Sequence, residues 1–140
     1  NTHSGTLTQD AWQTRDLGHE IVDEGGIVAV DTPSANQFQL AAGSYLIKWS
    51  APAYQVGAHQ TRLADITADP DEYVYGTSEV SSGSEAASRS FGSARVVAPS
   101  TNAYEIQHYC TTTVASSGFG ERNNFGNVLY FTLVEIYKES

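Results

Sequence analysis

The four histidines, His3, His19, His59 and His108, are the side chains best suited by type to acid–base chemistry or metal binding. None of them stands in an HExxH motif or in a Cys/His spacing typical of zinc sites. His59 and His108 could approach each other in the fold, and we interpret them as ordinary hydrogen-bonded histidines. Ser78 is not in a GxSxG motif, and no Ser-His-Asp set can be assembled by spacing. The sequence therefore predicts no catalytic residues and no enzymatic activity.

Acidic residues provide two weaker candidate sites. Asp69, Asp71 and Glu72 form an acidic turn whose oxygens could bind Ca²⁺, but they lack the EF-hand pattern. We therefore predict no metal and no other cofactor. Glu79 and Glu105 could be considered as the two acids of a glycosidase, which must stand together in a cleft. A polysaccharide-degrading domain is thus the most distant of the functions considered.

Three arginines, Arg62, Arg89 and Arg95, lie within or beside predicted strands rather than in acidic loops. We interpret them as partners in cross-strand or intersubunit salt bridges. Glu105 paired with Arg62 or Arg95 is a simpler interpretation of that carboxylate than a catalytic role.

The polar segment from Ser116 to Asn127 is the main candidate for recognition, because a rigid sandwich presents its loops to partners. It contains an aromatic ring beside carboxylate, guanidinium and amide groups, which suit sugar hydroxyls. The residues are Phe119, Glu121, Arg122, Asn123 and Asn124. Tyr54 is a lesser candidate for the same role. The alternative is a loop that packs against neighbouring subunits.

The elements that must position these side chains are β-strands. Tyr45, Ile47 and Trp49 alternate with mostly polar residues, which predicts a half-buried strand with an aromatic inner face. Pro52 is expected to end this strand, because proline has no N–H for a ladder. A second strand is predicted from His59 to Ile66. Together these segments form the centre of an antiparallel sandwich.

The rest of the chain is also predicted to consist of strands and turns. Further strands are expected over 11–17, 27–30, 37–40, 73–75, 91–97, 104–110 and 128–138, and loops over 76–90 and 111–127. No segment has sustained helical periodicity with caps. Turn signals every 8–12 residues indicate a sandwich or jelly roll.

The last predicted strand is apolar on both faces. One face carries Val128, Tyr130, Val134 and Ile136, and the other carries Leu129, Phe131, Leu133 and Tyr137. In a two-layer sandwich one face of each sheet normally meets water. We therefore expect a second copy of the chain to cover this strand. The alternative is a central strand covered by a long loop.

Length and composition limit the class of protein. The 140 residues suffice for one domain, predicted over 11–140 after a flexible lead-in over 1–10. The hydrophobic fraction is 40%, the charged fraction is only 16%, and the formal net charge is -9. This charge argues against a nucleic-acid partner, which would require clustered Lys and Arg.

Cys110 is the only cysteine, so no intrachain disulfide can form, and we expect a buried inert thiol. No apolar run approaches the roughly 20 residues that cross a bilayer, so no membrane insertion is expected. The sequence starts at Asn1 and contains no methionine. We expect a processed product or the end piece of a longer polypeptide, whose upstream part could carry the attachment to something larger.

An ordered series of short runs resembles a known family. The runs are Phe38-Gln39-Leu40, Gly43-Ser44-Tyr45, Ser50-Ala51-Pro52-Ala53-Tyr54, His59-Gln60-Thr61-Arg62-Leu63, Gly76-Thr77-Ser78-Glu79, Ser90-Phe91, Tyr104-Glu105-Ile106-Gln107-His108, Gly118-Phe119-Gly120, Asn124-Phe125-Gly126 and Val134-Glu135-Ile136-Tyr137-Lys138. They resemble the C1q/TNF-like C-terminal domain of bacteriophage tail-fibre and related virion proteins. The resemblance covers about Ala11 to Lys138.

The resemblance implies a jelly-roll sandwich of about ten antiparallel strands that forms a homotrimer. In that fold the last strand lies near the three-fold axis. The trimer interface is therefore expected to contain Tyr130, Phe131, Leu133, Val134 and Ile136. The resemblance also implies a place on the virion surface, after assembly in the host bacterial cytoplasm, and contact with other virion proteins through the missing upstream part.

We therefore interpret the chain as a phage or phage-like virion protein whose trimeric tip domain binds a host-surface glycan or receptor. Three weak sites held together would gain avidity without new contacts. The alternative is a capsid decoration or head-fibre protein with a mainly structural role.

Overall fold

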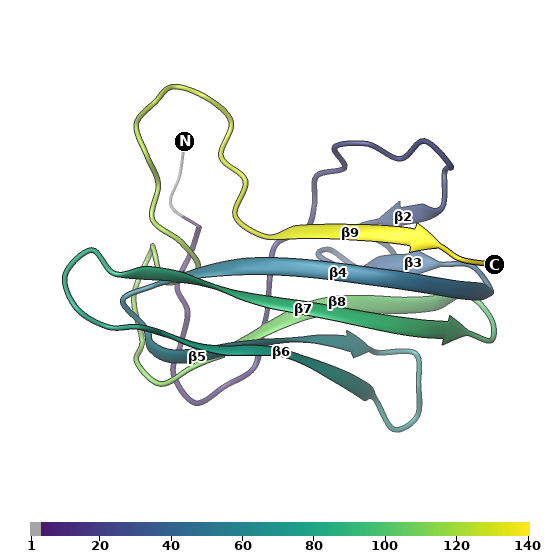
Figure 1. Ribbon diagram of the computed structural model, residues 1–140, viewed down its shortest axis with the longest axis horizontal. Helices are drawn as coiled ribbons and strands as arrows, with labels where there is room; N and C mark the ends of the chain where they lie inside the picture. The colour runs from purple at the N-terminus through teal and green to yellow at the C-terminus, as the bar shows by residue number, and fades with distance from the viewer. Residues whose placement is uncertain (1–3) are drawn as a thin grey trace.

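In the computed structural model, which describes residues 4–140, strand β4 (Gly43–Tyr54) lies at the centre of the smaller of two antiparallel sheets. It pairs with β7 (Ala87–Ala98) on one side and with β9 (Leu133–Lys138) on the other (Figure 1). The larger sheet has the order β2 (Val28–Val30), β3 (Phe38–Leu40), β8 (Asn102–Cys110), β5 (Gly57–Asp65) and β6 (Glu72–Ser81), and the short β1 (Gln13–Thr14) also pairs with β8.

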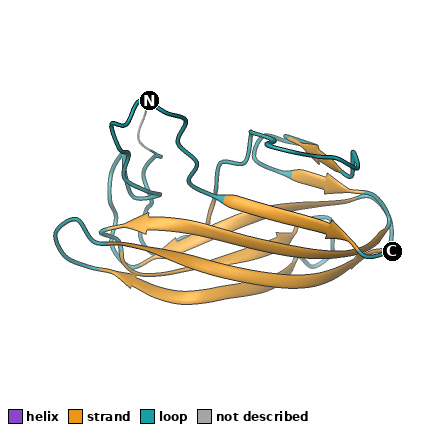
Figure 2. Ribbon diagram, turned by 45° about the horizontal axis from the view of Figure 1, so that its top comes forward, coloured by secondary structure: helices purple, strands orange, loops and turns teal. Residues whose placement is uncertain are grey.

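The all-β jelly-roll class is confirmed. Every pairing between the named strands β1–β9 is antiparallel, and Figure 2 shows strands and loops without a helix over residues 4–140. Across residues 4–140 no helix is long and apolar enough to span a membrane.

The main core lies between the two sheets. Tyr45, Ile47 and Trp49 are all buried, as their alternation predicts. The larger sheet contributes Phe38, Leu40, Leu63, Tyr104 and Ile106. The Trp49 ring covers Gly92 of the neighbouring strand so closely that a Cβ atom there would lie 1.9 Å from it. The Trp49 Nε1–H donates to Thr61 Oγ1 at 2.8 Å, which links the two sheets through a buried hydrogen bond.

A smaller apolar cluster closes one end of the sandwich. Its buried members are Leu7, Ala53, Val56 and Cys110. Leu7 is fully buried and exchanges backbone hydrogen bonds with Val114. The lead-in predicted over 1–10 therefore includes a segment that packs into the domain, while residues 1–3, with His3, lie outside the described part of the chain.

Cys110 is fully buried, as expected for a structural thiol. Its Sγ atom lies 3.3 Å from the carbonyl oxygen of Thr112. Burial raises the pKa of this thiol above its ordinary value, which keeps it protonated and poorly nucleophilic at neutral pH.

Pro52 does not end β4, and that prediction is wrong. The strand continues to Tyr54 because its partner on this stretch is β7, which pairs as far as Ala87. On the opposite side the ladder with β9 does stop, at Ser50 paired with Leu133. The missing N–H of proline thus ends one of the two ladders instead of the strand.

The segment 76–90, expected to be a loop, is mostly strand. β6 runs to Ser81 and β7 begins at Ala87, so the loop covers only 82–86. Polar serines can be buried in these strands, because their hydroxyl groups form hydrogen bonds with neighbouring backbone groups inside the fold. Ser90 Oγ–H donates to the Thr77 carbonyl oxygen at 2.7 Å.

The last strand is shorter than the range 128–138 predicted for it. Pairing begins at Leu133, and residues 128–132 join no ladder. Along β9, Leu133 and Tyr137 are exposed, whereas Val134 and Ile136 are half-buried against the main core. The strand therefore has apolar residues on both faces, as the sequence indicates.

Candidate functional site

Three connecting segments come together at one end of the sandwich: the loop between β6 and β7, the turn between β4 and β5, and the long segment between β8 and β9 (Figure 1). A hollow of about 570 Å³ opens among them. It is lined by Pro52, Tyr54, Glu85, Ala87, Arg89, Gly120, Glu121, Asn123 and residues 127–131. We refer to this feature as the loop-end hollow.

The loop-end hollow brings together several residues that the sequence suggests for recognition. Tyr54, at the end of β4, and both Glu121 and Asn123, in the long loop, line it. Arg122 and Asn124 are exposed in the same loop but are not among its lining residues. An aromatic ring, a carboxylate and an amide therefore face one space, as the predicted chemistry requires.

Phe119 has a different position from the one its predicted role implies. Its ring packs against the smaller apolar cluster, and the guanidinium carbon of Arg15 lies 4.5 Å from its centroid. The ring is half-buried and does not line the loop-end hollow. Its contacts indicate a residue that anchors the loop.

Two residues that line the hollow, Glu85 and Arg89, were not predicted from the sequence as recognition residues. Glu85 lies in the short loop before β7, which was hidden inside a longer predicted loop. Arg89 was interpreted as a salt-bridge residue, but its Nη2–H groups donate to the Phe131 carbonyl oxygen at 2.6 Å and to Ser50 Oγ at 3.1 Å. Burial lowers the pKa of this guanidinium. Arg89 therefore fixes one wall of the hollow.

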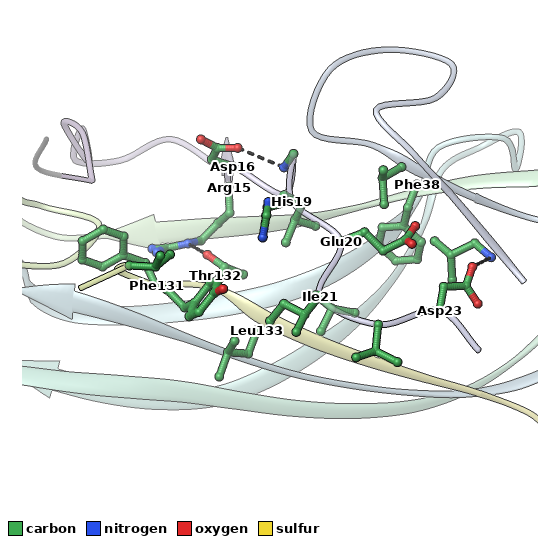
Figure 3. A pocket seen from close by; sticks show the side chains of 18 of the residues that line it. Arg15, Asp16, His19, Glu20, Ile21, Asp23, Phe38, Phe131, Thr132 and Leu133 are labelled. Atoms are coloured by element: carbon green, nitrogen blue, oxygen red, sulfur yellow. Dashed lines mark hydrogen bonds between the residues drawn. The ribbon is translucent and has the colours of Figure 1, made fainter. Parts of the chain in front are cut away.

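A wider groove of about 1230 Å³ lies on the other side of the segment 127–131, between residues 16–25 and β9 (Figure 3). All residues predicted at the trimer interface line it, namely Tyr130, Phe131, Leu133, Val134 and Ile136. Ile21 and Val22, on the opposite wall, are also exposed. We refer to this feature as the β9 groove.

The β9 groove also exposes an unpaired sheet edge. β9 pairs with β4 alone, so its second edge has no strand partner among the described residues. Acidic side chains such as Asp16 and Glu20 line the same groove (Figure 3). An apolar floor with polar residues around it is the usual anatomy of a protein–protein interface.

Arg15 lies at the end of the β9 groove and is almost fully buried. Its Nε–H donates to Thr132 Oγ1 at 2.6 Å, as Figure 3 shows. Its Nη1 and Nη2 groups donate to the carbonyl oxygens of Pro52, at 2.9 Å, and Phe119, at 2.8 Å. One side chain from the N-terminal segment thus ties together β4 and both ends of the 119–132 segment.

A chain of buried hydrogen bonds continues from Arg15 through both central histidines. Arg15 Nη1 lies 2.9 Å from His108 Nδ1, and His108 Nε2 lies 2.9 Å from His59 Nδ1. His59 Nε2 lies 2.8 Å from Ser88 Oγ, which donates to the Val80 carbonyl oxygen at 3.0 Å. We refer to Arg15, His108, His59 and Ser88 as the buried polar chain. The predicted approach of the two histidines is confirmed.

Arginine fixes the direction of every bond in this chain, because a guanidinium can only donate. His108 Nδ1 must accept from Arg15, so its proton is on Nε2 and is donated to His59. His59 must then hold its proton on Nε2 and donate it to Ser88. Both rings are neutral in this arrangement.

The surroundings favour the neutral rings. Burial, followed by the positive charge of Arg15, lowers the pKa of His108 to about 2. Burial is also the main cause that lowers the pKa of His59 to about 4, while Glu79 opposes the shift. Burial and the charge of Arg89 lower the pKa of Arg15 to about 9, so it remains a cation at neutral pH.

The predicted ion pairs are confirmed only in part. Arg95 Nε on β7 lies 3.1 Å from Oε1 of Glu139, which follows β9, so this arginine forms an ion pair as expected. Arg62 instead stacks on the rings of Trp12 and Tyr73, at 4.1 and 3.7 Å from the guanidinium carbon to the centroids. These two aromatic rings, together with Gln107 Oε1, which accepts from Arg62 Nε–H at 2.6 Å, take the place of a carboxylate.

Glu105 forms neither of the two ion pairs suggested for it. Its carboxylate accepts hydrogen bonds from the side-chain amides of Gln37 and Gln107. Glu79, the other acid of the considered catalytic pair, faces His59 across the β5–β6 ladder, whereas Glu105 faces Ala64 across the β5–β8 ladder. The two carboxylates are therefore positioned by different strands and do not form a common site.

The weak calcium candidate lies far from this end of the molecule, in the turn between β5 and β6 (Figure 1). Asp71 there accepts a hydrogen bond from the Tyr73 hydroxyl at 3.4 Å. Asp69 and Glu72 are exposed, and within residues 4–140 no group of three His, Cys, Asp or Glu side chains is arranged to hold a metal ion.

Comparison with known proteins supports the fold. No protein-family model and no curated protein sequence matches the chain. Among solved structures, it is similar to the globular domain of the zebrafish complement 1qA protein, with a TM-score of 0.61 and 11% sequence identity. The likeness covers 99% of this chain and 93% of the zebrafish domain. At this identity the comparison concerns architecture alone, and the architecture of this protein is a C1q-like jelly roll.

Proposed function

We propose that this protein is a non-enzymatic recognition domain of a phage or phage-like virion, which acts as a homotrimer and binds a host-surface glycan. The observation that carries the proposal is the loop-end hollow. It collects Tyr54, Glu121 and Asn123 with Glu85 and Arg89 at one end of a rigid sandwich.

The side chains in the loop-end hollow have the chemistry of a sugar site. A tyrosine ring can stack on the apolar face of a pyranose, and carboxylate and amide groups can exchange paired hydrogen bonds with its hydroxyls. Arg89 already uses its Nη2 donors on Ser50 and Phe131, so we assign it the role of fixing the wall. We assign the contact with the sugar to Tyr54, Glu85, Glu121 and Asn123. Glu121 Oε1 also accepts a hydrogen bond from the Arg122 N–H, and Asn123 Oδ1 accepts one from the Phe125 N–H, both at 3.1 Å.

The β9 groove supports the homotrimer. Leu133 is 42% exposed and Ile21 is 60% exposed, and both line a space that also contains half-buried Val134 and Ile136. Contiguous exposed apolar surface of this kind usually marks an interaction site. A second copy of the chain is the occupant that the proposed trimer supplies.

The place on the virion rests on the ordered runs from Phe38 to Lys138 that resemble phage tail-fibre and related virion proteins. A trimer at the end of a fibre would present three loop-end hollows to one surface. Three weak sites would then add their binding through avidity.

A glycan array probed with the purified wild-type chain tests the binding proposal. The proposal predicts binding to one class of bacterial surface glycan and a loss of at least about tenfold in the Tyr54→Ala and Asn123→Ala variants. Asn124→Ala is the matched control, because Asn124 is exposed in the same loop but does not line the hollow. A trimer that binds no glycan would favour the structural role of a capsid decoration protein.

A further inference from the structure

The buried polar chain has no capacity for an additional proton. Every ring nitrogen of His59 and His108 already has a partner, and the donor in each bond is fixed by Arg15. A proton added to His59 Nδ1 would point at the Nε2–H of His108 across 2.9 Å. A change of tautomer at His108 would only move the conflict, because its Nδ1–H would then face the Arg15 donor. One hydrogen bond of the buried polar chain must therefore break when either ring is protonated.

Arg15, the first residue of the buried polar chain, also anchors the segment between β8 and β9. Arg15 holds Phe119 and Thr132, the two ends of 119–132, while Arg89 holds Phe131 from the opposite side. Residues 127–131 of this segment separate the loop-end hollow from the β9 groove. Movement of Arg15 would therefore release one wall of the hollow.

A second positive charge beside Arg15 has little to neutralise it. Arg15 interacts with Arg89 on β7, which is repulsive, and with Asp16, which follows it in the chain. His59 faces Glu79 on β6 and Cys110 on β8 across its two ladders. Glu79 is the acid on the His59 side, and no carboxylate of the described residues hydrogen-bonds to either ring. Protonation would thus place two cations side by side in a buried site, where repulsion is strong.

We propose that the buried polar chain is an acid-sensitive latch, in which protonation of His59 or His108 expels Arg15 and frees the 119–132 segment from the body of the domain. The β-sheets themselves are held by separate apolar contacts and remain paired at the onset of opening. The transition falls below the ordinary histidine pKa of 6.5, because burial disfavours the charged rings. This inference adds a regulatory step to the proposed glycan site, but the opening of the segment does not depend on a ligand.

Hydrogen–deuterium exchange followed by mass spectrometry tests the latch on the full chain. Protection factors, corrected for intrinsic exchange, are compared for peptides from 119–132 and from β4 at about pH 7 and about pH 4.5. The latch predicts at least about a tenfold loss of protection in 119–132 at the lower pH through a local opening, while β4 loses only the protection that the fall in global stability removes and stays much better protected than 119–132. Equal protection of the two peptides at about pH 4.5, or no loss in 119–132 before global unfolding, would overturn the proposal.

The double variant His59→Gln/His108→Gln separates the latch from a general effect of acid. Glutamine can donate and accept but does not titrate, so protection of 119–132 should no longer depend on pH. His19→Gln is the control for a surface histidine beside the same segment, because His19 is exposed, does not belong to the buried polar chain, and its ring centroid lies 5.9 Å from that of Tyr130. The latch predicts that this variant keeps the pH response of the wild type. A pH response that persists in the double variant would contradict the role of the two histidines.

A direct measurement on the wild type covers the case in which the double variant does not fold. Nitrogen-15 NMR of the imidazole rings reports charge and tautomer. The latch predicts that His59 and His108 are both neutral at about pH 6, with their protons on Nε2. A charged ring, or a proton on Nδ1 of either residue, would refute the arrangement. Loss of glycan binding alone would affect the proposed function and leave this result intact.

Discussion

Arg15 Nη1 donates a hydrogen bond to the carbonyl oxygen of Pro52 at 2.9 Å, just beyond the point where the ladder between β4 and β9 ends. Proline provides no N–H to continue the ladder, and the arginine takes the backbone acceptor that remains. The guanidinium of buried Arg15 therefore holds the segment between β8 and β9 in place, where no strand pairing does so.

This arrangement predicts that Arg15→Lys destabilises the protein by about 2–4 kcal/mol. An ammonium on a flexible stem cannot reach Thr132, Phe119, Pro52 and His108 at once, so buried acceptors lose their donors. Urea denaturation of wild type and variant measures the difference. Arg95→Lys is the control: Arg95 is exposed on the sheet surface, and its loss should stay below about 1 kcal/mol. Equal effects of the two substitutions would contradict the account.

Stability should fall as the pH is lowered from about 6.5 towards 4. The folded pKa values of His59 and His108 lie below the unfolded value of 6.5, so the unfolded chain binds more protons in this range. The free energy of unfolding should decrease by about 1.4 kcal/mol per pH unit for each neutral histidine. The pKa of Asp23 is lowered by backbone hydrogen bonds from Ile27 and Val28, so this carboxylate stabilises the fold above its ordinary pKa of 3.8, and its contribution is lost only as the pH falls below that value.

Chemical denaturation at a series of pH values checks this slope. The double variant His59→Gln/His108→Gln should show a much flatter profile between about pH 6.5 and about pH 4. A profile that is flat in the wild type over the same interval would mean that the two rings are protonated in the folded state.

Gly92→Ala should destabilise the fold by about 3 kcal/mol or prevent folding, because the added methyl group would collide with the Trp49 ring. The variant should also shift the tryptophan emission, since Trp49 would have to leave its buried position. Ser93→Ala, at the next and exposed position of β7, should change stability by less than about 0.5 kcal/mol. A well-folded Gly92→Ala protein with unchanged emission would refute this packing.

Leu133→Asp should convert the proposed trimer into monomers without unfolding them. The side chain is 42% exposed in the single chain and lines the β9 groove, so a charge is harmful there only if a partner covers it. Sedimentation velocity measures the change. Val80→Asp is the matched control, because Val80 is an exposed apolar residue on β6 of the other sheet and outside both cavities. Dissociation by Val80→Asp alone would place the interface elsewhere.

Much of the fold follows from local pattern. The alternation of Tyr45, Ile47 and Trp49 correctly predicts the inner face of β4, and the resemblance correctly predicts the jelly-roll class. The range 76–90 misleads because buried serines such as Ser81 and Ser90 replace apolar residues in its strands. Their hydroxyls bond to backbone groups that only the folded sheets bring near.

The site is harder to predict because its parts are distant in sequence. The composition of the long loop suggests Glu121 and Asn123 as candidates for recognition, and both line the loop-end hollow, but Glu85 joins them only through the β6–β7 hairpin. Arg15 gives no local signal, since it stands between the polar residues Thr14 and Asp16 in the segment 11–17, which is predicted only as a short strand. Its role depends on four acceptors contributed by other parts of the chain.

The mass of the purified chain in solution, measured by light scattering at micromolar concentration, tests the proposed trimeric recognition domain most directly. The account predicts three times the 15.1 kDa mass of the chain, with the β9 groove covered by neighbouring copies. A folded particle of 15.1 kDa would contradict it, because the apolar β9 groove would then be open to water and three hollows could not act together.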